Sequence, residues 1–398
     1  MIKGTDSFYK ISIPGIWKGN MRDFCGTVLL EKKFFITEEQ AVTPAEILMG
    51  AFTDADKIYI NGICCGSSYD RYAPRIYPVA PGILRAGENV VCIHLYVFRG
   101  RGGAMPGKQY GIRFKKGKER WLDLSGTWDA QIRKQMEYLP EKTFFNYMAS
   151  AMFNGMISPV SPYKICAVIY YQGESDVGHP NRYALEFRAL VNDWRKSWKE
   201  KQLPIIYVQL AGFSDGNIKK QGTQWAEFRE VQRQAMEIEN TAMIQAYDVG
   251  EYNDLHPMDK KTLGMRAALA VHKLVYGEKE ECTGPQVRKI RLDRDKRVHA
   301  VFDQPLQTGS KKDGCELVSE VELRKANGDY KRAYVTVDGN EICAWLSDGE
   351  EPTGIRYAWK DCPMNICLYG KKGLPVIPFI KEWGRDAIYT GKICETYR

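Results

Sequence analysis

The chain has 398 residues, of which 44% are hydrophobic and 27% charged, so it is long enough for two or three globular domains. The net charge of +8 is spread along the whole length among acidic residues. It lacks the clustering that a nucleic-acid-binding surface needs, and no apolar run approaches the length of a membrane span.

The N-terminal part of the chain has the sequence pattern of a β-sandwich. Short runs of alternating hydrophobic and polar residues are separated by Gly, Pro and Asn turns, which predicts a β-sandwich domain over residues 1–120. Asn61-Gly62 stands between two apolar runs and predicts a tight hairpin, because both residues tolerate positive φ. The predicted strands include 26–35, 57–60, 90–96 and 110–114.

The middle of the chain, residues 121–283, changes to an alternation of strands and helices. Apolar runs predict strands at 165–171, 204–210 and 242–249. Residues at helical spacing predict helices at 183–198, 225–238 and 259–276. Near-continuous apolar strands that alternate with helices indicate a parallel sheet covered on both faces.

From residue 284 to 398 the alternation by twos returns, which predicts a C-terminal all-β domain. Its predicted strands are 298–302, 316–323, 333–337 and 341–345.

Three strand–helix units are few for a doubly wound domain. In such folds a nucleophile usually follows the first strand, at the start of the first helix. Nothing between residues 1 and 153 has that strand–turn–helix pattern. We therefore expect an incomplete parallel sheet without its leading piece.

Two polar segments follow the predicted strands. The first is Tyr170-Tyr171-Gln172-Gly173-Glu174-Ser175-Asp176, and the second is 248–257, which ends in His256-Pro257. Polar side chains directly after apolar strands are what an open α/β sheet presents to a substrate at its carboxyl edge. Both segments are therefore candidates for one site.

These segments are specific enough to suggest a family. The 154–159 segment (Asn-Gly-Met-Ile-Ser-Pro), the Tyr-Gln-Gly-Glu-Ser block, Asp193-Trp194-Arg195 and the 248–260 segment resemble the sialate O-acetylesterase family of SGNH-type hydrolases. Trp225 with 228–232, and the tail segments 355–359 and 373–379, are similar to further motifs of that family. The resemblance implies an SGNH-type α/β fold and hydrolysis of sugar O-acetyl esters through a serine acyl-enzyme without a cofactor.

Residues 1–120 resemble the galactosidase-type jelly roll that many family members carry inside the esterase domain. Trp17, Gly26 and the 54–62 segment carry this likeness. In the family, a Gly-Gln-Ser-Asn-Met block with the nucleophile precedes the insert, whereas this sequence begins within it. We therefore expect the catalytic serine to be absent from this chain, and a separate chain is one source of the missing segment.

Ester hydrolysis needs a base, a group that orients the base, and donors for the oxyanion. His256 is the candidate base, although a histidine on such a loop can also be a simple helix cap. Asp254 is the candidate orienting acid, with Asp248 as the alternative, and either aspartate can instead cap a turn. Gln172 and Gly173 are candidates for the oxyanion hole, or alternatively form only a tight turn.

Glu174 and Asp176 are candidates for substrate binding, but a charge pair at the start of a helix is an equal alternative. Ser125, Ser67-Ser68 and Ser214 stand in turn-like contexts, so none of them is a candidate nucleophile. The 11 cysteines include no CxxC pair, and there are five histidines. We therefore expect no metal, no other cofactor and a reducing, cytoplasmic location, in line with an N-terminus that lacks a signal-peptide pattern.

The sequence thus predicts a carbohydrate esterase that acts on O-acetylated sialic acid or a related sugar. The expected partners are this substrate and a chain that supplies the missing segment, with neither nucleic acid nor membrane. The main alternative is a non-catalytic carbohydrate-binding or scaffold protein of the same family. A galactosidase-related enzyme is a weaker one, because its pair of catalytic acids has no clear candidate.

Overall fold

The structure is a computed structural model that describes residues 9–117, 120–140, 143–145, 148–214, 221–309 and 320–383. The chain divides into two compact units, Met1–Phe144 and Phe145–Arg398.

The first unit is a sandwich of two antiparallel sheets. One has six strands in the order β1-β12-β3-β8-β5-β6, and the other has four in the order β11-β10-β4-β7. Alternate residues of these strands point inward, and Leu30, Ile47 and Ile93 are completely buried in the shared core. The elements are β1 (Tyr9–Ile13), β2 (Gly15–Ile16), β3 (Gly26–Ile36), α1 (Glu38–Ala41), β4 (Ala45–Met49), β5 (Ala55–Ile60), β6 (Ile63–Ser68), β7 (Ile76–Val79), β8 (Gly87–Val97), β9 (Gly103–Ala104), β10 (Tyr110–Phe114), β11 (Trp121–Asp123) and β12 (Gly126–Gln135).

The hairpin predicted at Asn61-Gly62 is confirmed: both residues have positive φ, 50° and 81°, between β5 and β6. The predicted boundary at residue 120 is too early. Trp121–Asp123 pairs with β10, and Gly126–Gln135 lies between β1 and β3 in the larger sheet. The sandwich needs these two late strands, so the first unit continues to residue 144.

The second unit contains a small parallel sheet in the order β13-β14-β15. Alternate residues of the central strand point to opposite faces: Tyr207 packs on the side of α2 and α3, and Ile206 packs on the side of α4. This confirms the predicted parallel sheet with helices on both faces. Its elements are η3 (Phe153–Ile157), β13 (Val168–Tyr170), η4 (Glu174–Asp176), α2 (Pro180–Ser197), β14 (Ile205–Gln209), α3 (Gln224–Gln234), η5 (Ala235–Glu237), β15 (Thr241–Gln245) and α4 (Lys260–Tyr276).

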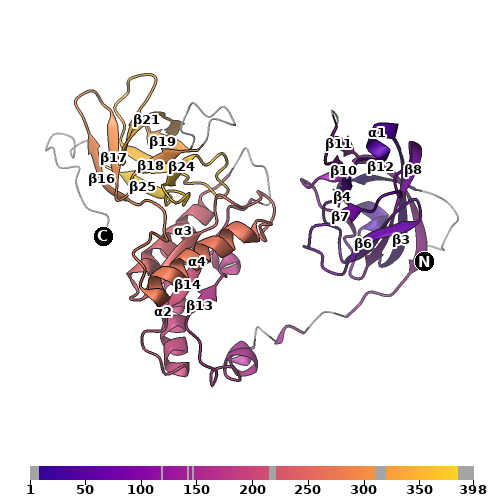
Figure 1. Ribbon diagram of the computed structural model, residues 1–398, viewed down its shortest axis with the longest axis horizontal. Coiled ribbons are helices and arrows are strands. Elements are labelled where there is room, and N and C mark those ends of the chain that lie inside the picture. Colours follow the sequence, from indigo (N-terminus) through magenta and orange to yellow (C-terminus); the bar gives the residue numbers. More distant parts are fainter. Residues whose placement is uncertain are drawn as a thin grey trace. The chain divides into compact units, whose positions relative to one another are not determined.

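The C-terminal strands form two four-stranded antiparallel sheets, β16-β17-β22-β21 and β20-β19-β23-β25, and the pair β18-β24. Figure 1 shows these strands at one end of the second unit and the helices with the parallel sheet at the other. The strands are β16 (Val287–Leu292), β17 (Val298–Phe302), β18 (Leu306–Thr308), β19 (Val321–Arg324), β20 (Tyr330–Arg332), β21 (Tyr334–Asp338), β22 (Glu341–Trp345), β23 (Gly354–Tyr357), β24 (Leu368–Gly370) and β25 (Phe379–Glu382).

No compact-unit boundary falls at residue 283, where the sequence predicts one. The aromatic ring of Tyr247, which follows β15, belongs to the hydrophobic core of the C-terminal strands, and its hydroxyl donates to the carbonyl oxygen of Val376. The α/β part and the C-terminal strands are therefore one packed body.

Two predicted strands differ in extent from the observed ones. Residues 165–171 were expected as one strand, but only Val168–Tyr170 pairs, because its single neighbour, β14, begins at Ile205. The prediction for 316–323 falls partly on residues 316–319, which lie outside the described residues, and Val321–Arg324 forms β19. Among the described helices, none has the length and apolar character that crossing a membrane requires.

Candidate active site

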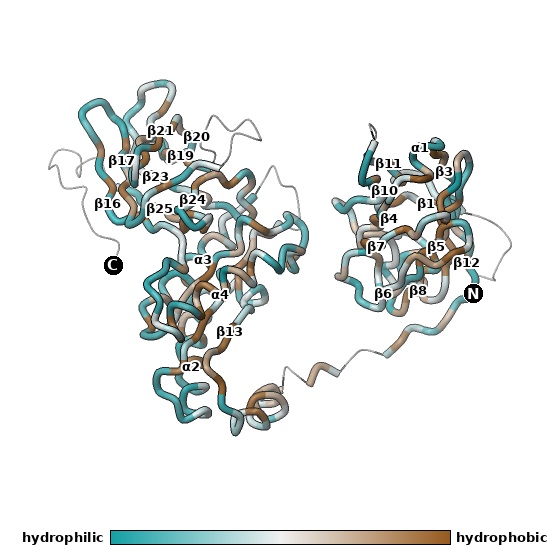
Figure 2. Tube along the Cα trace, in the orientation of Figure 1, coloured by the Kyte–Doolittle hydropathy of each residue, from teal (hydrophilic) through white to brown (hydrophobic). Residues whose placement is uncertain are grey.

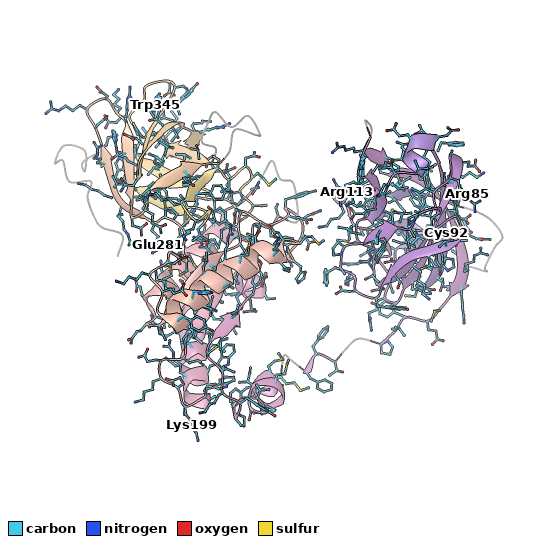
Figure 3. The ribbon with its side chains drawn as sticks, viewed as in Figure 1. Arg85, Cys92, Arg113, Lys199, Glu281 and Trp345 are labelled. Atoms are coloured by element: carbon cyan, nitrogen blue, oxygen red, sulfur yellow. The ribbon has the colours of Figure 1, made fainter. Side chains whose placement is uncertain are left out.

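The carboxyl ends of the three parallel strands lead into three loops at the same edge of the sheet. The loop after β13 carries Gln172 and Gly173, and the loop after β15 carries His256. At the opposite edge, α2 ends close to Lys199, which is labelled in Figure 3. The candidate residues therefore share one edge, as strand direction predicts.

Gly173 has a backbone conformation that a residue with a side chain rarely adopts. Its φ is 148°, and a Cβ atom added there would lie 2.9 Å from Cε1 of Phe228 on α3. The chain can turn sharply after β13 only because this residue has no side chain. Gly173 thus aims the polar segment away from the strand and into the loop.

The Gln172 side chain is exposed and belongs to a local hydrogen-bond network. Its Oε1 accepts from the Tyr170 hydroxyl at 2.7 Å, and its Nε2 donates to Asp176 Oδ2 at 3.4 Å. An amide nitrogen carries two hydrogens, so the contact with Asp176 occupies one of them. This geometry leaves Gln172 able to donate to a developing oxyanion.

Glu174 and Asp176 belong to the short helix η4, directly after Gly173. The main-chain N–H of Asp176 donates to the carbonyl oxygen of Gly173 at 2.9 Å, which closes this turn. Burial, and then the charge of Glu174, raise the pKa of Tyr171. Both residues therefore lie in the turn directly after Gly173.

His256 is exposed on the loop between β15 and α4. Asp254, which is buried, accepts a hydrogen bond from the main-chain N–H of His256 at 2.8 Å through Oδ1. The N–H of Asp254 in turn donates to the carbonyl oxygen of Glu251 at 3.0 Å. Asp254 thus holds the backbone at the histidine, which is the turn-capping contact that aspartate makes routinely.

Asp248, the alternative acid, is held in a buried ion pair. Both carboxylate oxygens accept from Arg266 at 2.7 Å, and the two side chains are 4% and 6% exposed. Burial lowers the pKa of Arg266, but the hydrogen bonds and the negative charge of Asp248 raise it by more. The pKa of Arg266 is therefore above its ordinary value. This bidentate pair joins the end of β15 to α4, so both carboxylate oxygens of Asp248 are committed to Arg266.

A contact between Tyr171 and Lys260 brings the two polar segments together. Lys260 Nζ lies 5.5 Å from the centre of the Tyr171 ring, within the range of a cation–π interaction. Tyr171 is the neighbour of Gln172, and Lys260 follows His256 by four residues at the start of α4. The structure therefore places the Gln172–Gly173 loop beside the His256 loop.

The loop after β14 lies against the loop after β15. The main-chain N–H of Ser214 donates to the carbonyl oxygen of Tyr252. A Cβ atom on Gly250 would lie 2.8 Å from the carbonyl oxygen of Gly212, so only glycine permits this approach. All three loops thus form one continuous rim at the carboxyl edge.

Two residues of the 228–232 segment fix this rim from α3. Gln232 accepts from the main-chain N–H of Leu210 at 2.9 Å and donates to the carbonyl oxygen of Val208 at 3.2 Å, which secures the end of β14. The fully buried Arg229 guanidinium donates to the carbonyl oxygens of Lys360 and Asp361, and burial lowers its pKa to about 10. The family-like segment therefore positions the site.

A polar cleft of about 440 Å³ opens where the start of α3 meets the C-terminal strands. The main-chain oxygen of Asp361, beside this cleft, accepts from the N–H of Phe213 at 3.2 Å and so links it to the loop after β14. No group of three or more His, Cys, Asp or Glu side chains that could hold a metal occurs within the described ranges. The cleft is lined by Gln221, Gly222, Thr223, Glu320, Glu322, Arg356, Trp359, Lys360 and Met364.

Parts of this chain are similar to known proteins. Residues 130–273 match the family model described as carbohydrate esterase, sialic acid-specific acetylesterase. This part of the chain is therefore similar to the sialate O-acetylesterases. The matched region contains the parallel sheet and all three loops of the rim.

Members of the family include the sialate O-acetylesterases of Pongo abelii and Mus musculus. The first is 28% identical over 260 residues, which cover 58% of this chain and 48% of that protein. The second is 30% identical over 275 residues, which cover 58% and 47%. The chain thus spans about half the length of these curated relatives.

A carbohydrate acetylesterase from Xanthomonas citri has a similar fold, with a TM-score of 0.54 and 20% sequence identity. The alignment covers 86% of this chain and 96% of that one. At this identity the likeness concerns the fold alone.

Sequence patterns did not predict three contacts of the second unit. Each of them joins residues from different elements. They are the Asp248–Arg266 ion pair, the Tyr171–Lys260 contact and the hydrogen bonds from Arg229 to main-chain oxygens. Helical spacing could have placed Arg266 on the buried face of α4, with Leu263, Ala267 and Ala270. A buried arginine on such a face indicates an acidic or carbonyl partner, but helical spacing does not identify that residue.

Proposed function

We propose that this chain supplies the catalytic histidine and the oxyanion donors of a carbohydrate esterase site. The enzyme would remove O-acetyl groups from sialic acid or a related sugar. The observation that carries this proposal is the Tyr171–Lys260 contact, which joins the Gln172 and His256 loops at the sheet edge. A base and an oxyanion donor must share one cavity, and these loops are neighbours.

In this mechanism His256 takes the proton from the attacking hydroxyl and returns it to the leaving sugar oxygen. Asp254 holds the main chain at His256 and contributes negative charge beside the imidazolium that forms. The Gln172 side-chain amide and the Gly173 N–H stabilise the oxyanion of the tetrahedral intermediate. Glu174 and Asp176 contribute to substrate binding through the loop that they fix. The serine comes from a polypeptide segment outside these residues.

The sugar binds in the polar cleft between α3 and the C-terminal strands. Hydroxyl groups of a sugar need both donors and acceptors, and the cleft supplies the carboxylates of Glu320 and Glu322 with the cations of Arg356 and Lys360. Trp359 adds an aromatic wall. These features support a polyhydroxylated substrate.

The two β regions are assigned by the same resemblance. The six-stranded and four-stranded sheets of the first unit support its assignment as a galactosidase-type jelly roll. The parallel sheet with helices on both faces supports an SGNH-type core.

Acetate release from O-acetylated sialic acid and from a chromogenic acetate ester tests the proposal. The chain alone should give background rates, and the chain with a serine-bearing segment of a family member should give turnover that His256→Ala abolishes. Turnover that His256→Ala leaves unchanged would reject the assigned base. Tight sugar binding without turnover in either mixture would favour the non-catalytic alternative.

A further inference from the structure

One wall of the polar cleft is formed by a pair of β-strands. Hydrophobic and polar residues alternate along β19, as Figure 2 shows, and Val321 and Leu323 are completely buried. Glu322 of β19 pairs in register with Arg356 of β23, so both side chains point to the other face of the sheet, where they line the cleft. Regular strands therefore fix the positions of two charged groups in this wall.

The backbone next to these strands is held in a conformation that residues with a side chain seldom adopt. Glu320 and Ala358 have φ values of 68° and 51°, in the left-handed region. The main-chain N–H of Ala358 donates to the carbonyl oxygen of Glu320 at 2.9 Å and so joins the two residues. Strained residues of this kind cluster at ligand-binding sites. Glu320 and Trp359 both line the cleft, so the strain lies at its wall.

The charged side chains of the cleft neutralise one another. Among the described residues that line it, two are carboxylates, Glu320 and Glu322, and two are cations, Arg356 and Lys360. Arg356 Nε donates to Glu322 Oε2 at 2.7 Å. Lys360 Nζ lies 3.0 Å from Glu320 Oε2 and 3.5 Å from Glu322 Oε1. Both cations of the described lining are therefore already paired with a carboxylate.

An anionic ligand would meet two obstacles in this cleft. The side chains of Glu320 and Glu322 are only 11% and 15% exposed, so water and salt screen their negative charges weakly. A ligand carboxylate would also have to displace a glutamate from Arg356 or Lys360, and that glutamate would remain close by as a like charge. Unfavourable contacts of this kind are a common source of specificity.

A hydroxyl group meets neither obstacle. It donates to a carboxylate oxygen and accepts from an ammonium or guanidinium group, so it adds to the ion pairs without breaking them. The guanidinium of Arg356 carries several N–H groups, of which Glu322 accepts from one, so donors remain for a sugar. Trp359 supplies apolar surface for the C–H face of a sugar ring.

We propose that the cleft selects an uncharged O-acetylated sugar and discriminates against a sugar that carries a carboxylate, such as sialic acid. Glu320 and Glu322 are the residues that set this preference, because they occupy both cations and repel a further anion. The inference rests on the proposed function, since it takes the cleft as the sugar-binding part of that site. It narrows the substrate to one of the two classes that the function leaves open.

The test compares two probes that have nearly the same size and differ in charge: O-acetylated N-acetylneuraminic acid and its carboxamide. Isothermal titration calorimetry of the full chain should show that the carboxamide binds at least about fivefold more tightly than the acid, because it is not repelled. Glu320→Gln should reduce this difference to about twofold or less, since it removes one negative charge and leaves Lys360 able to pair with the acid.

Glu280→Gln is the matched control. Glu280 pairs with Lys372 at 3.1 Å and is not part of the cleft lining, so this variant changes the net charge equally and should keep the preference for the carboxamide. Thermal unfolding shows whether each variant is folded, and the comparison of the two probes on the wild-type chain needs no variant.

Equal binding of the two probes, or tighter binding of the acid, would overturn the proposal. So would a preference that Glu320→Gln leaves unchanged, or the absence of binding by either probe. Binding is measured without turnover, so a preference for the carboxamide without acetate release in the presence of the serine-bearing segment would reject the esterase and keep this inference. Equal rates of acetate release from the two probes would keep the esterase and reject this inference.

Discussion

The ammonium group of Lys260 lies over the ring of Tyr171, 5.5 Å from its centre, and this contact joins the first and third loops of the sheet edge. Tyr171 is half-buried and packs against the hydrophobic cluster between the parallel sheet and α4. Lys260 begins α4, so the contact also sets where that helix starts relative to β13. This aromatic–cation pair is therefore one of the contacts that hold the Gln172 and His256 loops beside each other.

Replacing Lys260 by Met should loosen the His256 loop with little loss of overall stability. A cation–π contact at an exposed site contributes about 0.5–1 kcal/mol, so the free energy of unfolding should fall by no more than that. Amide exchange in the 251–258 loop should quicken, and Lys260→Arg should restore the wild-type rates because it keeps the cation. Identical exchange in Lys260→Met and wild type would show that the loop is held by other contacts.

Substitutions at the two aspartates near His256 should have different effects: one should lower the stability of the protein, and the other should lower its activity. Asp248→Asn leaves the buried Arg266 without its counter-charge, so the free energy of unfolding should fall by about 3–5 kcal/mol. Asp254→Asn keeps an oxygen that can accept from the His256 N–H, so stability should change by less than about 1 kcal/mol.

The same Asp254→Asn variant removes the charge beside the base, so kcat in the complex with the serine-bearing segment should fall about a hundredfold or more. Urea denaturation and acetate release measure the two effects. If Asp248→Asn lowered kcat per folded molecule more than Asp254→Asn, the assignment of Asp254 would be wrong.

Gly173→Ala should destabilise the second unit by about 1–3 kcal/mol, since a φ of 148° is strained for any residue with a side chain and its Cβ would press on Phe228. Gly178→Ala is the matched control in the same segment, because a Cβ there meets no atom within 4 Å. Urea denaturation of both variants gives the comparison. Equal stability of the two would mean that the turn after β13 can relax without loss.

The sequence predicted those parts of the fold that depend on local pattern. The helix at 259–276 was expected almost to the residue because Asp259 caps it and Gly277 ends it in a left-handed conformation. The strands at 110–114 and 298–302 were expected with their observed bounds, because every second residue of each, beginning with the first, is hydrophobic and buried. Such signals are contained within a few neighbouring residues.

Features that depend on distant residues were not predicted. The sandwich takes its last strand from 126–135, between two strands from the beginning of the chain, and no local signal announces that pairing. The candidate site divides in the same way. Its loops were found from polar residues after apolar strands. The ion pair of Asp248, by contrast, depends on Arg266 of α4, 18 residues further along the chain.

Alkaline pH should destabilise the second unit through Tyr207. Its hydroxyl is completely buried and donates to the carbonyl oxygen of Gln232 at 2.8 Å, and burial raises its pKa well above the usual value. A raised folded-state pKa contributes stability that is complete below about pH 10 and is lost as pH rises further, because only the unfolded tyrosine then releases its proton.

Tyr207→Phe should be about 1 kcal/mol less stable than wild type at pH 8, and this deficit should shrink by up to about 1.4 kcal/mol per pH unit above pH 10. Phe228→Leu, a nearby buried change without a titrating group, should keep a constant deficit. Urea denaturation between pH 8 and 11.5 measures both, and a constant deficit for Tyr207→Phe would show that Tyr207 does not control the alkaline limit.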